Sequence, residues 1–427
     1  MKAIKRLTSN NFVKSVAVLM TGTVLSQVIS LLISPVLTRI YEPEVMSDLN
    51  LYTRIVGFLA ALATARYELS LPLPKKDEHS YLIYRLSLKI AIIILVALSV
   101  VSVLYFAFTG FDFKLISFTA ITLTSAFFLT FTNLGVNWAI RKKEFKRISL
   151  SKILVSGVSN GFKWLFGVLG MGSNGLLLAS LLGFVVASLT FIKEWFSIDK
   201  NHSSFRSTKK TRVLAGIYRE FPSVSLPHAM VDLGKDLLLA FFMIFYFSKD
   251  VFAWYSLSYS VLQLPISVIG LAIGQVFFSR CAELASNGQS TLPLLKKTLL
   301  TLFLVSIGPF TILFFFGEPL FGFVFGKNWS NAGYYSQIMT IWFVVQFLNS
   351  VVSTLPSVLH RQREFFYLGI LNATIQITGF GLLPLIIGKG NDEFPTILWI
   401  VSIAQSVFFC YVLFSMLQFA KKGVKKK

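Results

Sequence analysis

The chain has 427 residues, of which 55% are hydrophobic and only 14% are charged, and its mean hydropathy is +0.70. A soluble globular domain carries about 25% charged residues, so this composition excludes an ordinary water-soluble fold and indicates a chain that faces lipid. The net charge of +21 would also suit a nucleic-acid-binding protein. However, the cations lie in short clusters between apolar stretches, without an aromatic platform or a recognised nucleic-acid fold, so no nucleic-acid partner is predicted.

Apolar segments of roughly 20 residues recur from one end of the chain to the other. Each is long enough to cross a ~30 Å hydrocarbon core as a helix. We therefore predict an all-α polytopic membrane protein with about twelve transmembrane helices. The predicted spans are 13–38, 49–70, 86–108, 115–140, 148–170, 175–194, 221–247, 251–279, 298–325, 333–358, 366–388 and 396–419.

The connections between these spans alternate between strongly basic and weakly basic. The weakly basic set contains only scattered cations: Arg39, Lys114, Lys249, Lys327 and Lys389. Both ends of the chain belong to the strongly basic set. Because cytoplasmic loops carry the excess of Lys and Arg, both termini are predicted to be cytoplasmic in a bacterial inner membrane. Two cytoplasmic ends require an even number of spans, and twelve satisfies this.

The longest predicted cytoplasmic connection, 196–220, lies in the middle of the chain. It is polar, basic and rich in Ser, which indicates a linker. We predict an N-terminal six-helix bundle at 1–195 and a C-terminal six-helix bundle with a basic tail at 221–427. Two similar bundles of this kind are typical of transporters with internal repeats.

Charged residues fall inside the predicted seventh span, where a charge at the bilayer centre costs on the order of 2.5–3.5 kcal/mol. Asp232, Lys235 and Asp236 share one helical face through spacings of three and four residues. Asp232 lies about 16 Å along the helix from Phe221, close to the midplane, at ~1.5 Å per residue. The fifth span carries Lys163 at a similar depth.

These charges allow two interpretations, which also involve Arg54 near the outer end of the second span. In the first, Asp232 and Lys235 neutralise each other while Arg54 reaches toward the membrane surface. In the second, Arg54, Lys163 and Lys235 line a hydrated cavity and bind an anionic headgroup, while Asp232 and Asp236 bind a coupling cation. Lys163 fits a structural role least well, because its own helix offers it no acidic partner.

Arg66 and Glu68 close the predicted second span on its inner side. The favoured interpretation is a local ion pair at the membrane edge, with a gate as the second interpretation. Catalytic motifs are missing from the sequence. It has no Walker A loop, and its four histidines form no metal-binding pair. We therefore predict a protein that is not an enzyme and carries no cofactor or metal.

Several stretches resemble the bacterial oligosaccharide flippases, the O-antigen and exopolysaccharide repeat-unit translocases of the multidrug/oligosaccharidyl-lipid/polysaccharide (MOP) exporter superfamily. The resemblance is carried by SPVLTRIYEP (34–43), ARYELSLPLP (65–74), REFPSVSLPH (219–228), LPISVIGLAIGQVFF (264–278) and VFGKNW (324–329). The family's usual Phe-Gly pair after the first loop is Met46-Ser47 here, a departure that concerns loop geometry.

The resemblance implies two pseudosymmetric, MATE-like bundles around a V-shaped central cavity. It also implies a substrate of undecaprenyl diphosphate carrying a short oligosaccharide, moved across the membrane by a proton or sodium gradient during lipopolysaccharide or other surface polysaccharide synthesis. Membrane lipid and a polysaccharide polymerase are the further expected partners. Three alternatives stay open: a cation-coupled multidrug exporter of the same fold, a flippase for the peptidoglycan precursor, and a membrane-embedded polymerase or ligase. The short outer connections disfavour the last of these.

Overall fold

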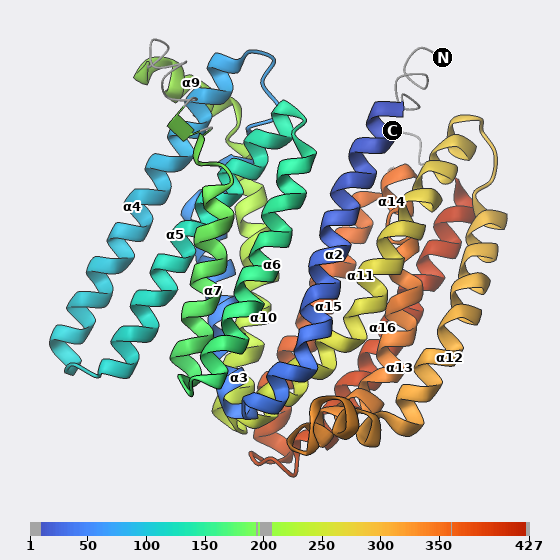
Figure 1. Cartoon of the computed structure of the whole chain (residues 1–427). Coiled ribbons are helices and arrows are strands. Elements are labelled where there is room, and N and C mark those ends of the chain that lie inside the picture. The colour runs from blue at the N-terminus through green and yellow to red at the C-terminus, as the bar shows by residue number, and fades with distance from the viewer. Residues whose placement is uncertain (1–9, 194, 197–206, 360, 424–427) are drawn as a thin grey trace. The chain divides into compact units, whose positions relative to one another are not determined.

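The computed structural model describes residues 10–193, 195–196, 207–359 and 361–423. Within these ranges the chain forms helices joined by short turns and contains no β-strand (Figure 1). This confirms the predicted all-α polytopic fold. The twelve long helices are α2 (Asn10–Ile40), α3 (Pro43–Ala63), α4 (Asp77–Thr109), α5 (Phe113–Lys142), α6 (Phe145–Val168), α7 (Gly172–Leu189), α10 (Leu226–Tyr246), α11 (Lys249–Ser286), α12 (Leu292–Phe325), α13 (Ser330–Val352), α15 (Gln362–Ile387) and α16 (Phe394–Lys422).

Ten helical segments in the described ranges are long and apolar enough to cross a membrane. They include parts of every long helix except α6 and α10. These two helices carry most of the charges that the sequence places inside the membrane, Lys163 on α6 and Asp232, Lys235 and Asp236 on α10. The chain is therefore a multi-pass membrane protein, and most of the candidate site lies on these two charge-bearing helices.

The second span differs from its predicted range of 49–70, because α3 begins at Pro43 and ends at Ala63. Proline suits the first turn of a helix, where its missing N–H costs nothing. At the other end, Ala65 and Arg66 have φ values of 47° and 61°, in the left-handed region that breaks a right-handed helix. The 3₁₀ turn η1 (Tyr67–Ser70) follows this break.

The described chain divides into two compact units. The first contains residues up to Tyr41 and Asp48–Leu237, and the second contains Glu42–Ser47 and Leu238–Lys427. The predicted division at 1–195, 196–220 and 221–427 stays a prediction. Residues 197–206 of the predicted linker lie outside the described residues, and its described part contains the short helix α9 (Thr208–Ile217).

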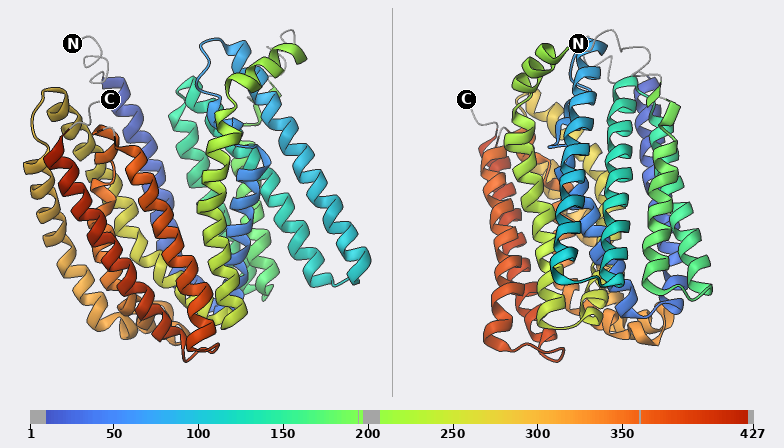
Figure 2. Two further views of the ribbon diagram at one scale, coloured as in Figure 1. Left: turned by 180° about the vertical axis from the view of Figure 1, so that it is seen from behind. Right: turned by 90° about the vertical axis from the view of Figure 1, so that its left-hand side faces the viewer.

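In the first unit, α2 packs along α6, α6 along α7, and α7 along α5. The helices α4 and α5 form an antiparallel pair that turns at Gly110, whose φ of 97° favours glycine. At the other end of this pair, α9 lies across the beginning of α4 (Figure 1), and Figure 2 shows the same arrangement from two further sides.

The outward faces of the helices are apolar, whereas many buried positions hold small polar residues. Large hydrophobic side chains are exposed along α4 and α12, among them Ile93, Phe108 and Phe323. Buried positions of α6 include Ser156 and Asn160. This is the pattern expected of helices that face lipid and meet one another through small and hydrogen-bonding residues.

The second unit contains a close helix crossing between α12 and α13. A Cβ atom on Gly333 would overlap the backbone of Gly317 and of Glu318. The α13 helix also packs on α11 and α16, and its Trp342, Phe343 and Phe347 are among the most deeply buried side chains of the chain. Small residues at the crossing thus let two backbones approach closely, as is common between membrane helices.

Candidate functional site

The helices α3 and α10 bring three of the predicted site residues together within the first unit. Arg54 Nη1 donates a 2.8 Å hydrogen bond to the backbone oxygen of Asp236. Lys235 Nζ lies 3.4 Å from Asp236 Oδ1. Directly before Lys235, a Cβ atom on Gly234 would lie 3.7 Å from Cε2 of Phe58, one turn after Arg54, so the glycine leaves room for the facing α3 side chain. We call Arg54, Lys235 and Asp236 the α3–α10 charge cluster.

The α3–α10 charge cluster contains two cations and one carboxylate, so it has a positive balance. The Lys235 side chain is only 16% exposed, whereas Asp236 is 50% exposed. A mostly buried ammonium beside a more accessible carboxylate can change partner if another anion approaches. Charge-assisted hydrogen bonds from Arg and Lys are the usual means by which proteins hold phosphate groups.

Asp232 lies outside the cluster's contacts and pairs with a residue that the sequence reasoning did not select. Its Oδ2 is 3.3 Å from His228 Nδ1, one helical turn earlier, and its side chain is 65% exposed. Lys235 pairs with Asp236, so the predicted neutralisation of Asp232 by Lys235 is not the pairing found. The spacing of four residues between His228 and Asp232 was the available signal.

Lys163 lies on α6, apart from the contacts of the α3–α10 charge cluster. Its backbone oxygen accepts a 2.7 Å hydrogen bond from the hydroxyl of Tyr41, directly after the end of α2. Among the described residues no carboxylate forms an ion pair with its side chain. The expectation that its own helix offers no acidic partner therefore agrees with the geometry.

The remainder of the α2–α6 interface is a row of polar contacts. Lys152 Nζ donates to Thr23 Oγ1 at 2.8 Å, and the hydroxyls of Ser30 and Ser156 are 2.9 Å apart. Asn160 Nδ2 donates to Ser30 Oγ at 3.1 Å, an interhelical bond. Lys152 was missed by the sequence reasoning, because only the packing of α2 on α6 reveals its partner, 129 residues away. One lysine of α6 thus joins two helices, while Lys163 does not.

The predicted gate residues Arg66 and Glu68 form a local ion pair at the end of α3. Arg66 Nη1 lies 3.5 Å from Glu68 Oε1, and the Glu68 side chain is only 3% exposed. Burial raises the pKa of Glu68, although hydrogen bonds and the Arg66 charge act in the opposite direction. Glu68 Oε2 and Arg66 Nε have no hydrogen-bond partner in the described ranges. The geometry is that of a local ion pair, which is the interpretation that the sequence favours, and a gating role stays a prediction.

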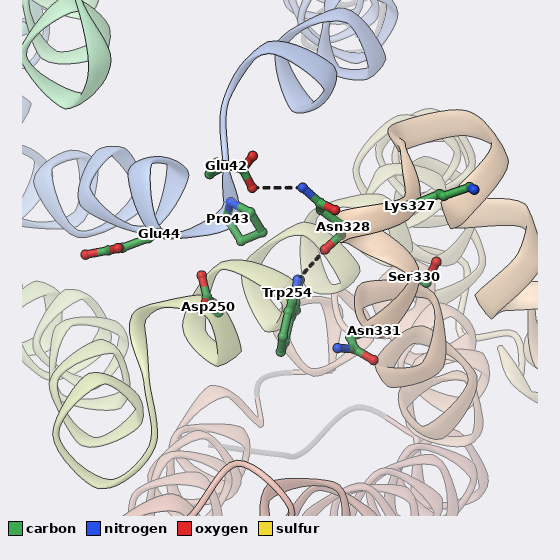
Figure 3. A pocket seen from close by; sticks show the side chains of 9 residues that line it. All are labelled: Glu42, Pro43, Glu44, Asp250, Trp254, Lys327, Asn328, Ser330 and Asn331. Atoms are coloured by element: carbon green, nitrogen blue, oxygen red, sulfur yellow. Dashed lines mark hydrogen bonds between the residues drawn. The ribbon is translucent and has the colours of Figure 1, made fainter.

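A polar cavity of about 500 Å³ lies in the second unit, where the α2–α3 connection meets the beginning of α11 and the turn before α13 (Figure 3). Asn328 Nδ2 donates to Glu42 Oε2 at 2.8 Å, and Trp254 Nε1 donates to the Asn328 backbone oxygen at 2.9 Å. Lys249 Nζ lies 3.5 Å from Glu44 Oε1. These bonds fasten residues 42–47 to the second unit. The motif VFGKNW ends here, but the sequence does not reveal its partners.

Comparison with known proteins places this geometry in a family. Residues 75–334 match the family described as polysaccharide biosynthesis protein, whereas no curated protein sequence matches the chain. Among solved structures, the fold is similar to an inward-facing multidrug resistance MATE family transporter of the MOP superfamily. That match has a TM-score of 0.65 and 16% identity and covers 94% of this chain and 96% of that one.

The fold is also similar to the lipid II flippase MurJ in an inward closed conformation, with a TM-score of 0.67, 14% identity, and coverage of 95% of this chain and 89% of that one. A MOP superfamily transporter from Pyrococcus furiosus Vc1, described as having a binding pocket of reverse polarity, matches with a TM-score of 0.53, 14% identity, and coverage of 94% and 96%. At these identities the structural matches establish the fold. The family match spans well over half of the chain, and the protein therefore belongs to the polysaccharide biosynthesis protein family, with the fold of the MOP superfamily transporters.

Proposed function

We propose that this protein is a flippase that moves undecaprenyl-diphosphate-linked oligosaccharide repeat units from the cytoplasmic to the outer leaflet of a bacterial inner membrane. The product would feed surface polysaccharide synthesis, such as that of O-antigen and lipopolysaccharide. The observation that carries the proposal is the α3–α10 charge cluster, together with Lys163, inside the helices of a polysaccharide biosynthesis family member. A multidrug resistance transporter and a lipid II flippase share the fold, which supports transport as the activity class.

Arg54, Lys163 and Lys235 would bind the diphosphate during its passage. A diphosphate cannot enter hydrocarbon unaided, because a charged group loses its hydration there. In the proposed mechanism, a phosphate oxygen replaces Asp236 as the partner of Lys235. The reverse exchange releases the headgroup on the other side, so binding stays reversible. The polyprenyl tail would remain in lipid throughout.

Asp232 and Asp236 are the proposed coupling residues, acting by alternating access. Asp232 is accessible, and its partner His228 carries charge only when protonated, so a proton can alter this pair. Sodium is the other candidate ion. The proposal includes no ATP hydrolysis and no covalent chemistry by this chain.

The test is a deletion of the gene in its host, complemented with the wild type or with single variants. Lys163→Met and Lys235→Met remove each charge, whereas Lys163→Arg and Lys235→Arg keep it. Surface polysaccharide and membrane-embedded lipid-linked oligosaccharide are measured, with protein abundance checked for each variant. We expect the deletion and both methionine variants to lose polysaccharide and accumulate the lipid-linked unit, while the arginine variants restore export at least in part.

Lys114→Met is the matched control, since Lys114 is exposed at the start of α5 and its side chain forms no ion pair with the described residues. It should behave as wild type. Intact polysaccharide with altered drug tolerance in the deletion strain would favour the multidrug exporter. Accumulation of repeat units already exposed on the outer leaflet would favour a polymerase or ligase. Full rescue by both methionine variants would remove the lysines from the proposed path.

A further inference from the structure

A basic cavity lies in the first unit, where α9 crosses the beginning of α4. Its volume is about 410 Å³, within the ~300–1,000 Å³ range of small-ligand sites. Its apolar lining residues are Leu82, Leu86 and Ala215. Its polar side chains are Arg85, Lys89, Ser207, Thr208, Thr211 and Arg212. We call it the α4–α9 pocket.

The three cations of the α4–α9 pocket have no acidic partner among the described residues. Within the described ranges, Arg85, Lys89 and Arg212 form no ion pair. Arg85 Cζ lies 5.9 Å from the centroid of the Tyr81 ring. The nearby acids are engaged elsewhere, because Asp77 pairs with Arg141 and Lys142 and Glu78 pairs with Lys210. The pocket therefore has an uncompensated charge of three cations, which favours a ligand with more than one negative charge.

The packing of α9 gives this pocket a defined shape. Leu214 of α9 is buried in a cluster that includes Tyr81 and Leu82 of α4. The Tyr67 hydroxyl donates to the Ala215 backbone oxygen at 3.1 Å, and Lys210 Nζ lies 2.6 Å from Glu78 Oε1. The cations of α4 and α9 are thus presented from packed helices.

Exposed apolar side chains continue from the α4–α9 pocket along α4. On α4, the positions that follow Lys89 along the same helical stripe are Ile93, Val96 and Val100, all exposed. A molecule whose charge sits in the pocket can therefore lay a hydrocarbon chain along α4. A cationic pocket beside exposed apolar side chains is the combination found at a membrane interface.

We propose that the α4–α9 pocket binds the phosphate groups of a resident anionic phospholipid with two phosphates, of the cardiolipin class. Basic pockets at the cytoplasmic ends of transmembrane helices bind such headgroups through the charge attraction described here. The site shares no residue with the transport path proposed above, since its cations are Arg85, Lys89 and Arg212, whereas the path uses Arg54, Lys163 and Lys235. The inference does not depend on the transported substrate.

The test uses the purified full-length protein in detergent with added lipid. Thermal stability and native mass spectrometry are measured with cardiolipin, phosphatidylcholine, undecaprenyl diphosphate and inorganic pyrophosphate. We expect cardiolipin to raise the melting temperature and to bind at least tenfold more tightly than the other three. The triple variant Arg85→Gln, Lys89→Gln, Arg212→Gln should weaken cardiolipin binding by about 100-fold, at roughly 1 kcal/mol for each cation.

Lys209→Gln is the matched control, because Lys209 is an exposed cation of α9 that does not line the pocket. It should bind cardiolipin as the wild type does. If the triple variant is not folded when only phosphatidylcholine is present, two other experiments replace it: the single variant Arg212→Gln, and a salt titration of the wild type. Both the variant and added salt should weaken cardiolipin binding. Equal binding of phosphatidylcholine, or equal binding by the pocket variants, would overturn the proposal. Tighter binding of undecaprenyl diphosphate would assign the pocket to the cargo, and tighter binding of pyrophosphate would assign it to a free anion.

Discussion

At the scale of single residues, Asp236 has two functions in the α3–α10 charge cluster. Its carboxylate lies beside Lys235, and its backbone oxygen accepts the hydrogen bond from Arg54. The side-chain contact can be removed without altering the backbone contact. Asp236 therefore allows the competition between carboxylate and substrate for Lys235 to be tested separately from the position of Arg54.

We expect Asp236→Asn to strengthen binding of a diphosphate, because Lys235 loses its competing carboxylate while Arg54 keeps its backbone bond. An increase in affinity of about tenfold is expected from the removal of one nearby negative charge. Farnesyl diphosphate binding to the purified protein measures this, with Lys235→Met as the comparison that should weaken binding. Polysaccharide export should fall in Asp236→Asn, since release slows. Unchanged affinity in Asp236→Asn would contradict the proposed exchange of partners.

Glu68 gives a second prediction, on the pH dependence of stability. Because its pKa is raised in the folded protein, the folded state holds this proton more tightly than the unfolded state does. Its contribution to the free energy of unfolding is thus present below the ordinary carboxyl pKa of about 4.3 and is lost as pH rises through the folded value.

We expect Glu68→Gln to be more stable than wild type at pH 8 and to vary less between pH 4 and pH 8. Thermal unfolding followed across this range measures the difference. Glu283→Gln is the control, since Glu283 is exposed and its surface pair with Arg280 contributes little to stability. A profile for Glu68→Gln that parallels the wild type would show that the Arg66 charge compensates the burial of Glu68.

At the scale of helices, contacts between small residues determine how closely pairs of helices approach. The α12–α13 crossing depends on Gly333, where a side chain would meet backbone and not a movable side chain. The α2–α6 interface instead uses hydrogen bonds among Ser30, Ser156 and Asn160. Both are ways to join helices in lipid, where apolar contact alone provides little preference for protein over lipid.

We expect Gly333→Ala to destabilise the protein by about 3 kcal/mol, the upper part of the range for overpacking, because neither backbone can yield. Gly308→Ala on α12 is the matched control, since a Cβ there meets nothing within 4 Å. It should be neutral or stabilising by up to about 1 kcal/mol, the helix propensity difference. Folded yield and melting temperature in detergent measure both. Equal stability of the two variants would mean that the crossing can widen without cost.

The positions of the twelve long helices could be predicted from the sequence because lipid requires an apolar segment of defined length. The end of α3 could not, since Ala65 and Arg66 take left-handed backbone conformations without a glycine to signal them. The sequence shows which spans carry charges, Lys163 on α6 and Asp232, Lys235 and Asp236 on α10. Their pairing followed the three-dimensional arrangement, as with Lys152, whose partner Thr23 lies on another helix.

At the scale of the whole molecule, the two compact units do not follow the order of the chain. Residues 42–47, between two helices of the first unit, belong to the second. Their attachment uses the bond from Asn328 to Glu42 and the bond from Trp254 to the Asn328 backbone oxygen. A connection between helices is thus held as part of a tertiary structure formed by residues almost 300 positions later.

We expect Asn328→Ala to increase hydrogen exchange at residues 42–47, because the Glu42 carboxylate loses its donor. The protection there should fall by about fivefold to tenfold, as for the loss of one exposed hydrogen bond to a charged group. Asn331→Ala is the control, since Asn331 lines the same cavity but makes no side-chain hydrogen bond with the described residues. Unchanged exchange in Asn328→Ala would mean that the Lys249–Glu44 pair suffices to hold the connection.

The chain passes between the units at three places: after Tyr41, after Ser47 and after Leu237. The third falls inside the continuous helix α10, one residue beyond Asp236. Any rearrangement of one unit against the other must be absorbed by backbone rotation at these junctions, as hinges absorb domain closure. A bend in α10 at this junction would displace the backbone oxygen that Arg54 holds. A bend in α10 and the position of Arg54 beside Asp236 are therefore coupled through one peptide group, the one whose oxygen accepts the hydrogen bond from Arg54.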